Sequence, residues 1–123
     1  MPIEIIVDKN INGHYILDYD IKKNDQESVI PITDRKIYNQ LSDFAKDAFK
    51  ALDGKSLGRI DIKMNHNGVP HFIEANLMPG LQKGYFYRSC LLNLGMSYEQ
   101  MILTITNNGL GLCTQVNRQV LSF

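Results

Sequence analysis

The chain runs Arg59-Ile60-Asp61, Asn65-His66-Asn67-Gly68, Phe72-Ile73-Glu74-Ala75-Asn76 and Met78-Pro79-Gly80 through its middle. An Asn-Gly pair between two runs of alternating apolar residues predicts a β-hairpin with a two-residue turn. If this dipeptide forms the turn, Asp61 faces Glu74 and Arg59 faces Asn76 across the two strands. The fold is therefore expected to be organised around a charged hairpin.

One face of this hairpin is predicted to be polar. Alternation places Arg59 and Asp61 on one side of the first strand, with Phe72, Glu74 and Asn76 on the same side of the second. Two facing carboxylates repel each other. A cation between them removes the repulsion, and oxygen donors without Cys or His suit Mg²⁺ or Mn²⁺. The alternative is a solvated face whose charges have no function.

The repulsion has a measurable consequence. In the metal-free chain, Asp61→Asn should be neutral or stabilising, by an amount comparable to the ~0.2–1 kcal/mol of a cross-strand pair. The same substitution should abolish metal binding, because it removes a charged ligand. Arg59, beside this pair, could offset charge on a phosphoryl group.

These residues also carry a resemblance to a known family. The Arg-x-Asp run at 59–61, the Glu-x-Asn run at 74–76 and the Pro-Gly pair at 79–80 resemble the end of the ATP-grasp domain of D-alanine–D-alanine ligases. The Gly-Met-Ser-Tyr segment at 95–98 is similar to the opening of the family's final helix. The resemblance spans residues 30–107.

The resemblance implies a role for each motif residue. Asp61 would hold one metal ion, Glu74 would bridge two, and Asn76 would hold the second. Arg59 would contact the phosphoryl group or the acyl phosphate, and the Gly80 amide would stabilise an oxyanion. The implied cofactor is Mg²⁺ or Mn²⁺, with ATP as co-substrate.

The segment after Gly80 departs from the family. D-alanine–D-alanine ligases usually carry Thr and then Ser here, where this chain has Gln82 and Tyr85. These two residues and Lys83 are candidate substrate contacts, so a ligase with other substrates stays open. A second interpretation places Tyr85 and Phe86 in a packing cluster of aromatic side chains.

Composition limits the other classes of function. A chain of 123 residues with 44% hydrophobic residues predicts one globular domain over 1–123, with its core in 30–107. A formal net charge of zero argues against nucleic acid as a partner. Neither a membrane-spanning apolar run nor a signal peptide is recognisable, so the cytoplasm is the expected location.

The expected fold class is α+β: a largely antiparallel sheet with helices packed on it, similar to the C-terminal ATP-grasp subdomain. The predicted elements are strands at 3–7 and 14–20 that form a hairpin, a polar loop at 22–28, a helix from Thr33 or Asp34 to Asp53-Gly54, the charged hairpin, a loop at 77–87, helices at 89–94 and from 97 to a stop at Asn107-Asn108-Gly109, and a weaker helix at 112–123.

The predicted function is that of the C-terminal, metal-bearing part of an ATP-dependent carboxylate–amine ligase. A family enzyme has roughly 300 residues, beyond the usual single-domain range, and no Gly-rich phosphate loop or paired lysines are recognisable here. The expected partners are ATP, small carboxylate and amine substrates and the N-terminal part of the ligase, and pairing of two copies stays open. The isolated chain is expected to be inactive. The alternative is a non-catalytic interaction domain or inactive remnant.

Overall fold

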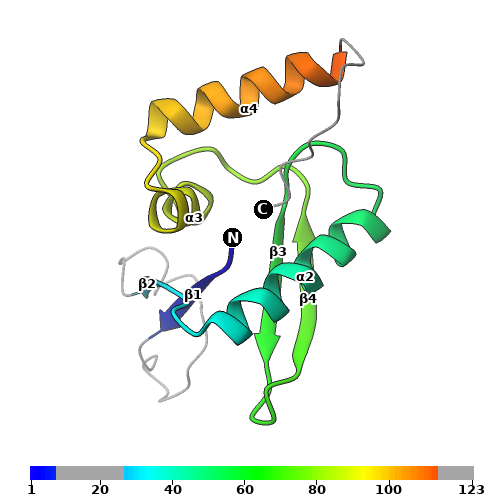
Figure 1. The fold of residues 1–123 in the computed structure, drawn as a ribbon, viewed down its shortest axis with the longest axis vertical. Coiled ribbons are helices and arrows are strands. Elements are labelled where there is room, and N and C mark those ends of the chain that lie inside the picture. The colour runs from blue at the N-terminus through cyan, green and yellow to red at the C-terminus, as the bar shows by residue number, and fades with distance from the viewer. Residues whose placement is uncertain (8–26, 114–123) are drawn as a thin grey trace.

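The computed structural model describes residues 1–7 and 27–113. The elements, in chain order, are β1 (Ile3–Val7), β2 (Glu27–Pro31), α2 (Arg35–Ala51), β3 (Arg59–Met64), β4 (Pro70–Asn76), α3 (Tyr85–Leu94) and α4 (Tyr98–Cys113) (Figure 1). This arrangement confirms the predicted α+β class. Within the described part of the chain, no helix has the length and apolar character needed to cross a membrane.

The strands form two separate antiparallel pairs, β1 with β2 and β3 with β4. Ile3 faces Pro31, and Val7 faces Glu27. The predicted polar loop at 22–28 is therefore wrong at its last two residues, which already belong to β2. The strand predicted at 14–20 lies outside the described residues.

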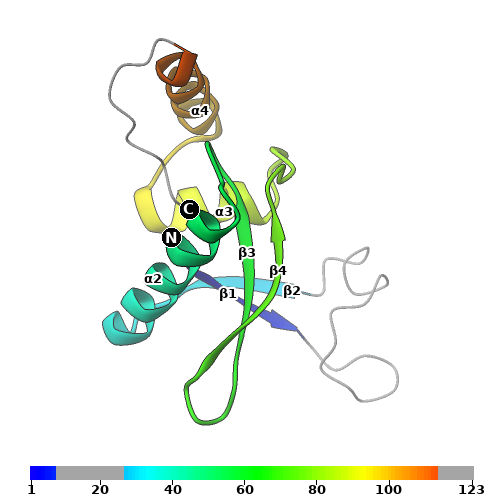
Figure 2. The ribbon, with the colours of Figure 1, turned by 90° about the vertical axis from the view of Figure 1, so that its right-hand side faces the viewer.

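Helix α2 lies across the β3–β4 hairpin (Figures 1 and 2). Its start confirms the predicted cap, because the Asp34 carboxylate accepts hydrogen bonds from the backbone N–H groups of Lys36 at 2.8 Å and Ile37 at 3.0 Å. Leu41 and Phe49 are its buried side chains. These two apolar side chains therefore mark the side of α2 that packs against the rest of the fold.

The chain reverses direction after α2, close to the Asp53-Gly54 pair at which the sequence predicted the helix to end. Asp53, and not Gly54, adopts the left-handed conformation, with a φ of 55°. Gly54 and Gly58 serve close packing instead, because a Cβ atom at either position would overlap the Phe49 ring. For Gly58 the nearest ring atom would lie at 2.8 Å. The ring thus sits directly on the segment that leads into β3.

The β3–β4 hairpin differs from the prediction at its turn. The loop has three residues, His66 to Gly68, because Asn65 N–H donates to the Val69 carbonyl at 3.0 Å and Gly68 has a φ of 74°. Pairing near the turn is consequently shifted by one residue, and Ile62 faces Phe72. A bulge at Ile73 then restores the predicted register. The placement of Phe72 on the polar face was therefore wrong, because it shares a face with Ile62.

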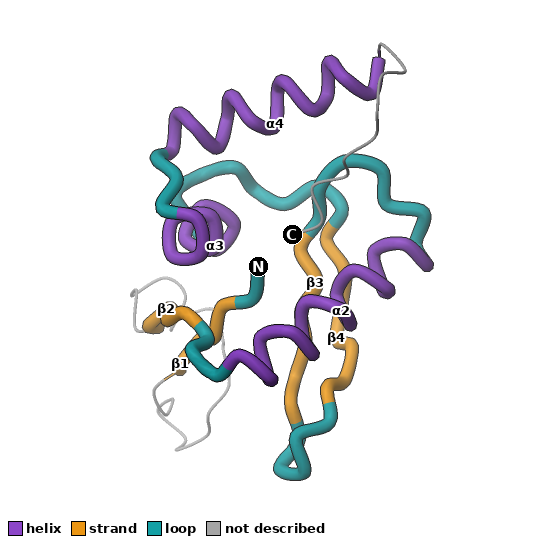
Figure 3. The backbone as a smooth tube through the Cα atoms, viewed as in Figure 1, coloured by secondary structure: helices purple, strands orange, loops and turns teal. Residues whose placement is uncertain are grey.

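A cluster of buried residues lies between α3 and α4, and the loop from β4, teal in Figure 3, leads the chain to it. Its buried residues are Phe86, Cys90 and Met101. Burial raises the pKa of the Cys90 thiol, which suits a packing role. Reciprocal hydrogen bonds between Ser97 and Gln100 form a capping box at the start of α4, where the sequence predicted a helix to begin.

The bounds of both helices differ from the prediction. Helix α3 begins at Tyr85, so the predicted loop at 77–87 was too long. Helix α4 continues through Asn107, Asn108 and Gly109 to Cys113, so the predicted stop was wrong. Most of the helix predicted at 112–123 lies outside the described residues.

Candidate metal and phosphate site

The start of β3 and the end of β4 bring the predicted polar residues together. Arg59 is the cross-strand partner of Asn76, and Asp61 is the partner of Glu74. Both pairs lie on the side of the Ile73 bulge away from the turn, where the predicted register is confirmed. Because cross-strand partners share a face of a sheet, the four side chains gather at one end of the hairpin.

Arg59 links the two carboxylates. Its Nε and Nη2 atoms donate to Asp61 Oδ1 at 2.7 Å and Oδ2 at 2.9 Å, and Nη2 also donates to Glu74 Oε1 at 3.3 Å. The Asp61 hydrogen bond holds the pKa of the Arg59 guanidinium above its ordinary value, against the effect of its partial burial. The guanidinium therefore supplies the cation that the carboxylate pair requires.

This contact reverses the expectation for Asp61→Asn. We now expect the substitution to lower the free energy of unfolding by about 0.5–1 kcal/mol, because it removes a two-pronged ion pair that is only partly exposed. Urea denaturation in the presence of a chelator measures the change.

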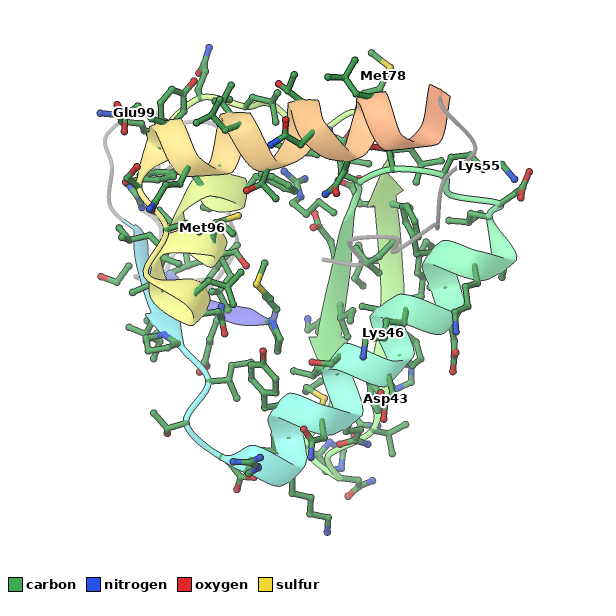
Figure 4. All side chains as sticks on the ribbon, turned by 45° about the horizontal axis from the view of Figure 1, so that its top comes forward. Asp43, Lys46, Lys55, Met78, Met96 and Glu99 are labelled. Carbon is green, nitrogen blue, oxygen red and sulfur yellow. The ribbon has the colours of Figure 1, made fainter. Side chains whose placement is uncertain are left out.

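Asp43→Asn is the matched control. Asp43 lies 3.8 Å from Lys46 on α2, and its side chain is 74% exposed (Figure 4). The Asp43–Lys46 pair should contribute less to the free energy of unfolding than the Asp61–Arg59 pair, because solvent screens it more completely. An Asp61→Asn protein as stable as the wild type, or more stable, would show that repulsion from Glu74 outweighs the Arg59 contact.

Asn76 begins the Pro-Gly loop. Its Oδ1 atom accepts a hydrogen bond from the Met78 N–H at 3.0 Å, which turns the chain out of β4. An amide oxygen has two lone pairs, so this contact leaves one for another donor or an ion. Gly80 is exposed, and a Cβ atom there would meet nothing within 4 Å. Packing therefore does not explain the glycine at this position.

Tyr85, the first residue of α3, joins the charged cluster. Its ring centroid lies 6.0 Å from Arg59 Cζ, which is at the outer range of a cation–π contact. Phe86, by contrast, is only 5% exposed and belongs to the core. The two aromatic residues, which the sequence did not distinguish, thus lie in different environments.

The other two substrate candidates have local partners. Lys83 Nζ lies 5.6 Å from the centroid of the Tyr98 ring, and Tyr87 packs edge-on against the same ring. The Gln82 carbonyl accepts a hydrogen bond from the Gly84 N–H at 2.7 Å. Lys83 is therefore associated with the start of α4, whereas Tyr85 is associated with β3.

Comparison with known proteins assigns the family. The profile described as D-ala D-ala ligase C-terminus matches residues 1–107. The chain belongs to this family. It is 34% identical over 89 residues to a D-alanine--D-alanine ligase of Ligilactobacillus salivarius (strain UCC118). The aligned residues make up 69% of the chain and 24% of that relative.

A second relative gives the same result. The chain is 30% identical over 105 residues to a D-alanine--D-alanine ligase of Streptococcus pyogenes serotype M49 (strain NZ131), with 83% of the chain and 29% of the relative covered. The matched part is thus about a quarter of the length of these relatives. The comparison with solved structures found no match.

This family implies a bound divalent cation, so the side chains at the end of the hairpin should supply suitable ligands for one. Within residues 1–7 and 27–113, no three His, Cys, Asp or Glu side chains cluster as a metal site. The available set is two carboxylates and one amide, from Asp61, Glu74 and Asn76. Such oxygen donors suit Mg²⁺ when water and phosphate oxygens complete its shell. The Arg59 guanidinium, itself a cation, already bridges the two carboxylates. The carboxylates are therefore close enough together to share one positive charge, and the donor set fits a cation.

An open apolar pocket is lined in part by the loop that follows β4. It has a volume of about 550 Å³ and is lined by residues 53–57, 77–79 and Leu81. Met78 is one of the lining residues, although its side chain is 89% exposed and points away from the ribbon (Figure 4). The pocket could not be predicted from the sequence, because its two walls are distant in the chain.

Proposed function

We propose that the chain is the C-terminal part of an ATP-dependent carboxylate–amine ligase. In this proposal the end of the β3–β4 hairpin binds a divalent cation and the phosphates of ATP. The observation that carries it is the meeting of Arg59, Asp61, Glu74 and Asn76 at one end of one hairpin. Membership of the D-ala D-ala ligase C-terminus family supports the ligase class.

Each residue then has a distinct task. Asp61, Glu74 and Asn76 would hold Mg²⁺ or Mn²⁺, which offsets phosphate charge when it is bound. Arg59 would contact oxygens of the transferred phosphoryl group, because a guanidinium matches two such oxygens at once. The Gly80 N–H would donate to the oxyanion that forms when the amine attacks. These are electrostatic tasks, which suit a rigid pair of strands.

The substrates would be a small carboxylate and a small amine. Tyr85 contacts Arg59, so it is the best placed of the substrate candidates, with Gln82 and Lys83 nearby in the chain. The rest of the ligase would cover the nucleotide and exclude water, which strengthens these electrostatic contacts. Because the reaction consumes ATP, we place it in the cytoplasm.

Nucleotide should strengthen metal binding by this chain. Mn²⁺ alone would have few protein ligands, whereas Mn²⁺ with a non-hydrolysable ATP analogue brings phosphate oxygens that Arg59 can also contact. Electron paramagnetic resonance of free Mn²⁺ would measure this against a protein-free sample, because the analogue itself binds Mn²⁺, and the affinity of the protein for Mn²⁺ is expected to rise about tenfold in the ternary mixture. If the analogue instead strips Mn²⁺ from the protein, the proposed phosphate site is wrong.

A non-catalytic interaction domain is the second candidate. The observation in its favour is the open pocket beside Met78, whose walls include Leu57, Leu77 and Pro79. Exposed apolar surface of this kind often marks a protein contact. The two candidates differ in the nucleotide experiment, because an interaction domain has no reason to bind Mn²⁺ more tightly when the analogue is present.

A further inference from the structure

The contacts of Arg59 raise a question about how a metal ion could bind. Both Asp61 oxygens accept hydrogen bonds from the guanidinium, at 2.7 Å and 2.9 Å, and Glu74 Oε1 accepts another at 3.3 Å. These carboxylates are also the charged donors of the proposed metal site. Arg59 and a divalent cation therefore require the same atoms.

We propose that Arg59 is a resident counter-ion which competes with the divalent cation for Asp61 and Glu74. Binding of the ion would release the guanidinium from the carboxylates. This inference rests on the proposed function, because it assumes that the two carboxylates are metal ligands. It adds that the metal-free site is closed by a residue of the chain itself.

Competition follows from charge and from geometry. A guanidinium and a metal ion are both positive, so they repel each other when they share one carboxylate. The repulsion is substantial because the Arg59 and Asp61 side chains are only 32% and 36% exposed, which limits screening by water. A two-pronged contact also leaves Asp61 little freedom to reorient toward an ion.

The position of Tyr85 suggests where the released guanidinium goes. The Tyr85 ring already lies 6.0 Å from Arg59 Cζ, and it comes from α3 and not from the hairpin. A guanidinium that leaves Asp61 can keep this contact and remain beside the ion. It would then be available to phosphate oxygens, which is the task proposed for Arg59.

Arg59→Gln provides the direct test. Removing the competing charge should tighten Mn²⁺ binding about tenfold, measured without nucleotide by electron paramagnetic resonance of free Mn²⁺. Lys63→Gln is the matched control, because it removes the same charge from β3. Among the described residues Lys63 forms no ion pair, so this variant should change the affinity less than about twofold.

The outcomes separate the two proposals. Equal effects of Arg59→Gln and Lys63→Gln, or weaker binding by Arg59→Gln, would overturn the competition but leave the metal site intact. Failure of both the wild type and Arg59→Gln to bind Mn²⁺, with or without the ATP analogue, would overturn both proposals. Circular dichroism shows whether each variant is folded.

A measurement on the wild type avoids dependence on a variant. The NMR signal of the Arg59 Nε–H group reports its hydrogen bond to Asp61. Addition of Mg²⁺ should shift this signal and speed its exchange with water, with the same midpoint as the amide shifts of Asp61. An Arg59 signal that stays constant while the Asp61 amide titrates would contradict the competition.

Discussion

Phe49→Ala is expected to lower the free energy of unfolding by about 3–5 kcal/mol, the usual cost of removing a buried aromatic ring. Phe49 is only 3% exposed, and its ring packs on Gly54 and Gly58, where α2 turns into β3. Because a whole domain is typically stable by about 5–15 kcal/mol, this one substitution would remove much of the total. Urea denaturation followed by circular dichroism measures the loss.

Phe72→Ala is the control for this prediction. The same side chain is removed from β4, but Phe72 is 45% exposed, so the loss should stay below about 1.5 kcal/mol. Comparable losses in the two variants would mean that the Phe49 ring does not join α2 to the hairpin as described.

The part of the hairpin that carries the site could be predicted from the sequence. Alternation of apolar and polar residues fixed which residues share a face, and the Asn-Gly pair fixed where the chain turns. The prediction for Asp61 and Glu74 was nevertheless correct for an incomplete reason. A three-residue loop shifts the register by one, and the bulge at Ile73 shifts it back.

Features set by distant contacts could not be predicted. The pairing of β1 with β2 joins segments separated by residues 8–26, and no local pattern specifies such a partner. Helix α3 begins after Gly84, which has no side chain to cap the helix, so the usual start signal is missing. Helix α4 continues past Gly109, although a glycine inside a helix costs about 1 kcal/mol.

The site itself differs from the prediction in its charge balance. From the sequence alone, Asp61 and Glu74 form a repelling pair that needs an external ion. Arg59 lies two residues before Asp61 in the same strand, so it shares the face and can reach both carboxylates. The pattern predicts a phosphate contact for Arg59 and no ion pair with these carboxylates. Its second role depends on a side-chain conformation, which alternation along a strand does not specify.

Glu74→Gln is expected to weaken Mn²⁺ binding in the presence of the ATP analogue by more than about tenfold, because even indirect support of a metal ligand is worth 10–100-fold. The Glu74 side chain is 61% exposed and makes one 3.3 Å contact with Arg59, so the fold should be almost unaffected. Electron paramagnetic resonance of free Mn²⁺ measures the binding.

Glu99→Gln is the matched control, because Glu99 is an exposed carboxylate at the start of α4 (Figure 4). It should bind Mn²⁺ like the wild type. Equal affinities of the two variants would show that Glu74 is not a ligand and that Mn²⁺ associates with the protein through general negative charge.

Binding of a divalent cation at this end of the hairpin can be located by the paramagnetic broadening that substoichiometric Mn²⁺ causes in backbone amide signals. The broadening should be strongest at Asp61, Glu74 and Asn76, and it should increase there when the ATP analogue is added. Broadening centred instead on His66 and His71, toward the turn of the same hairpin, would contradict binding at this site.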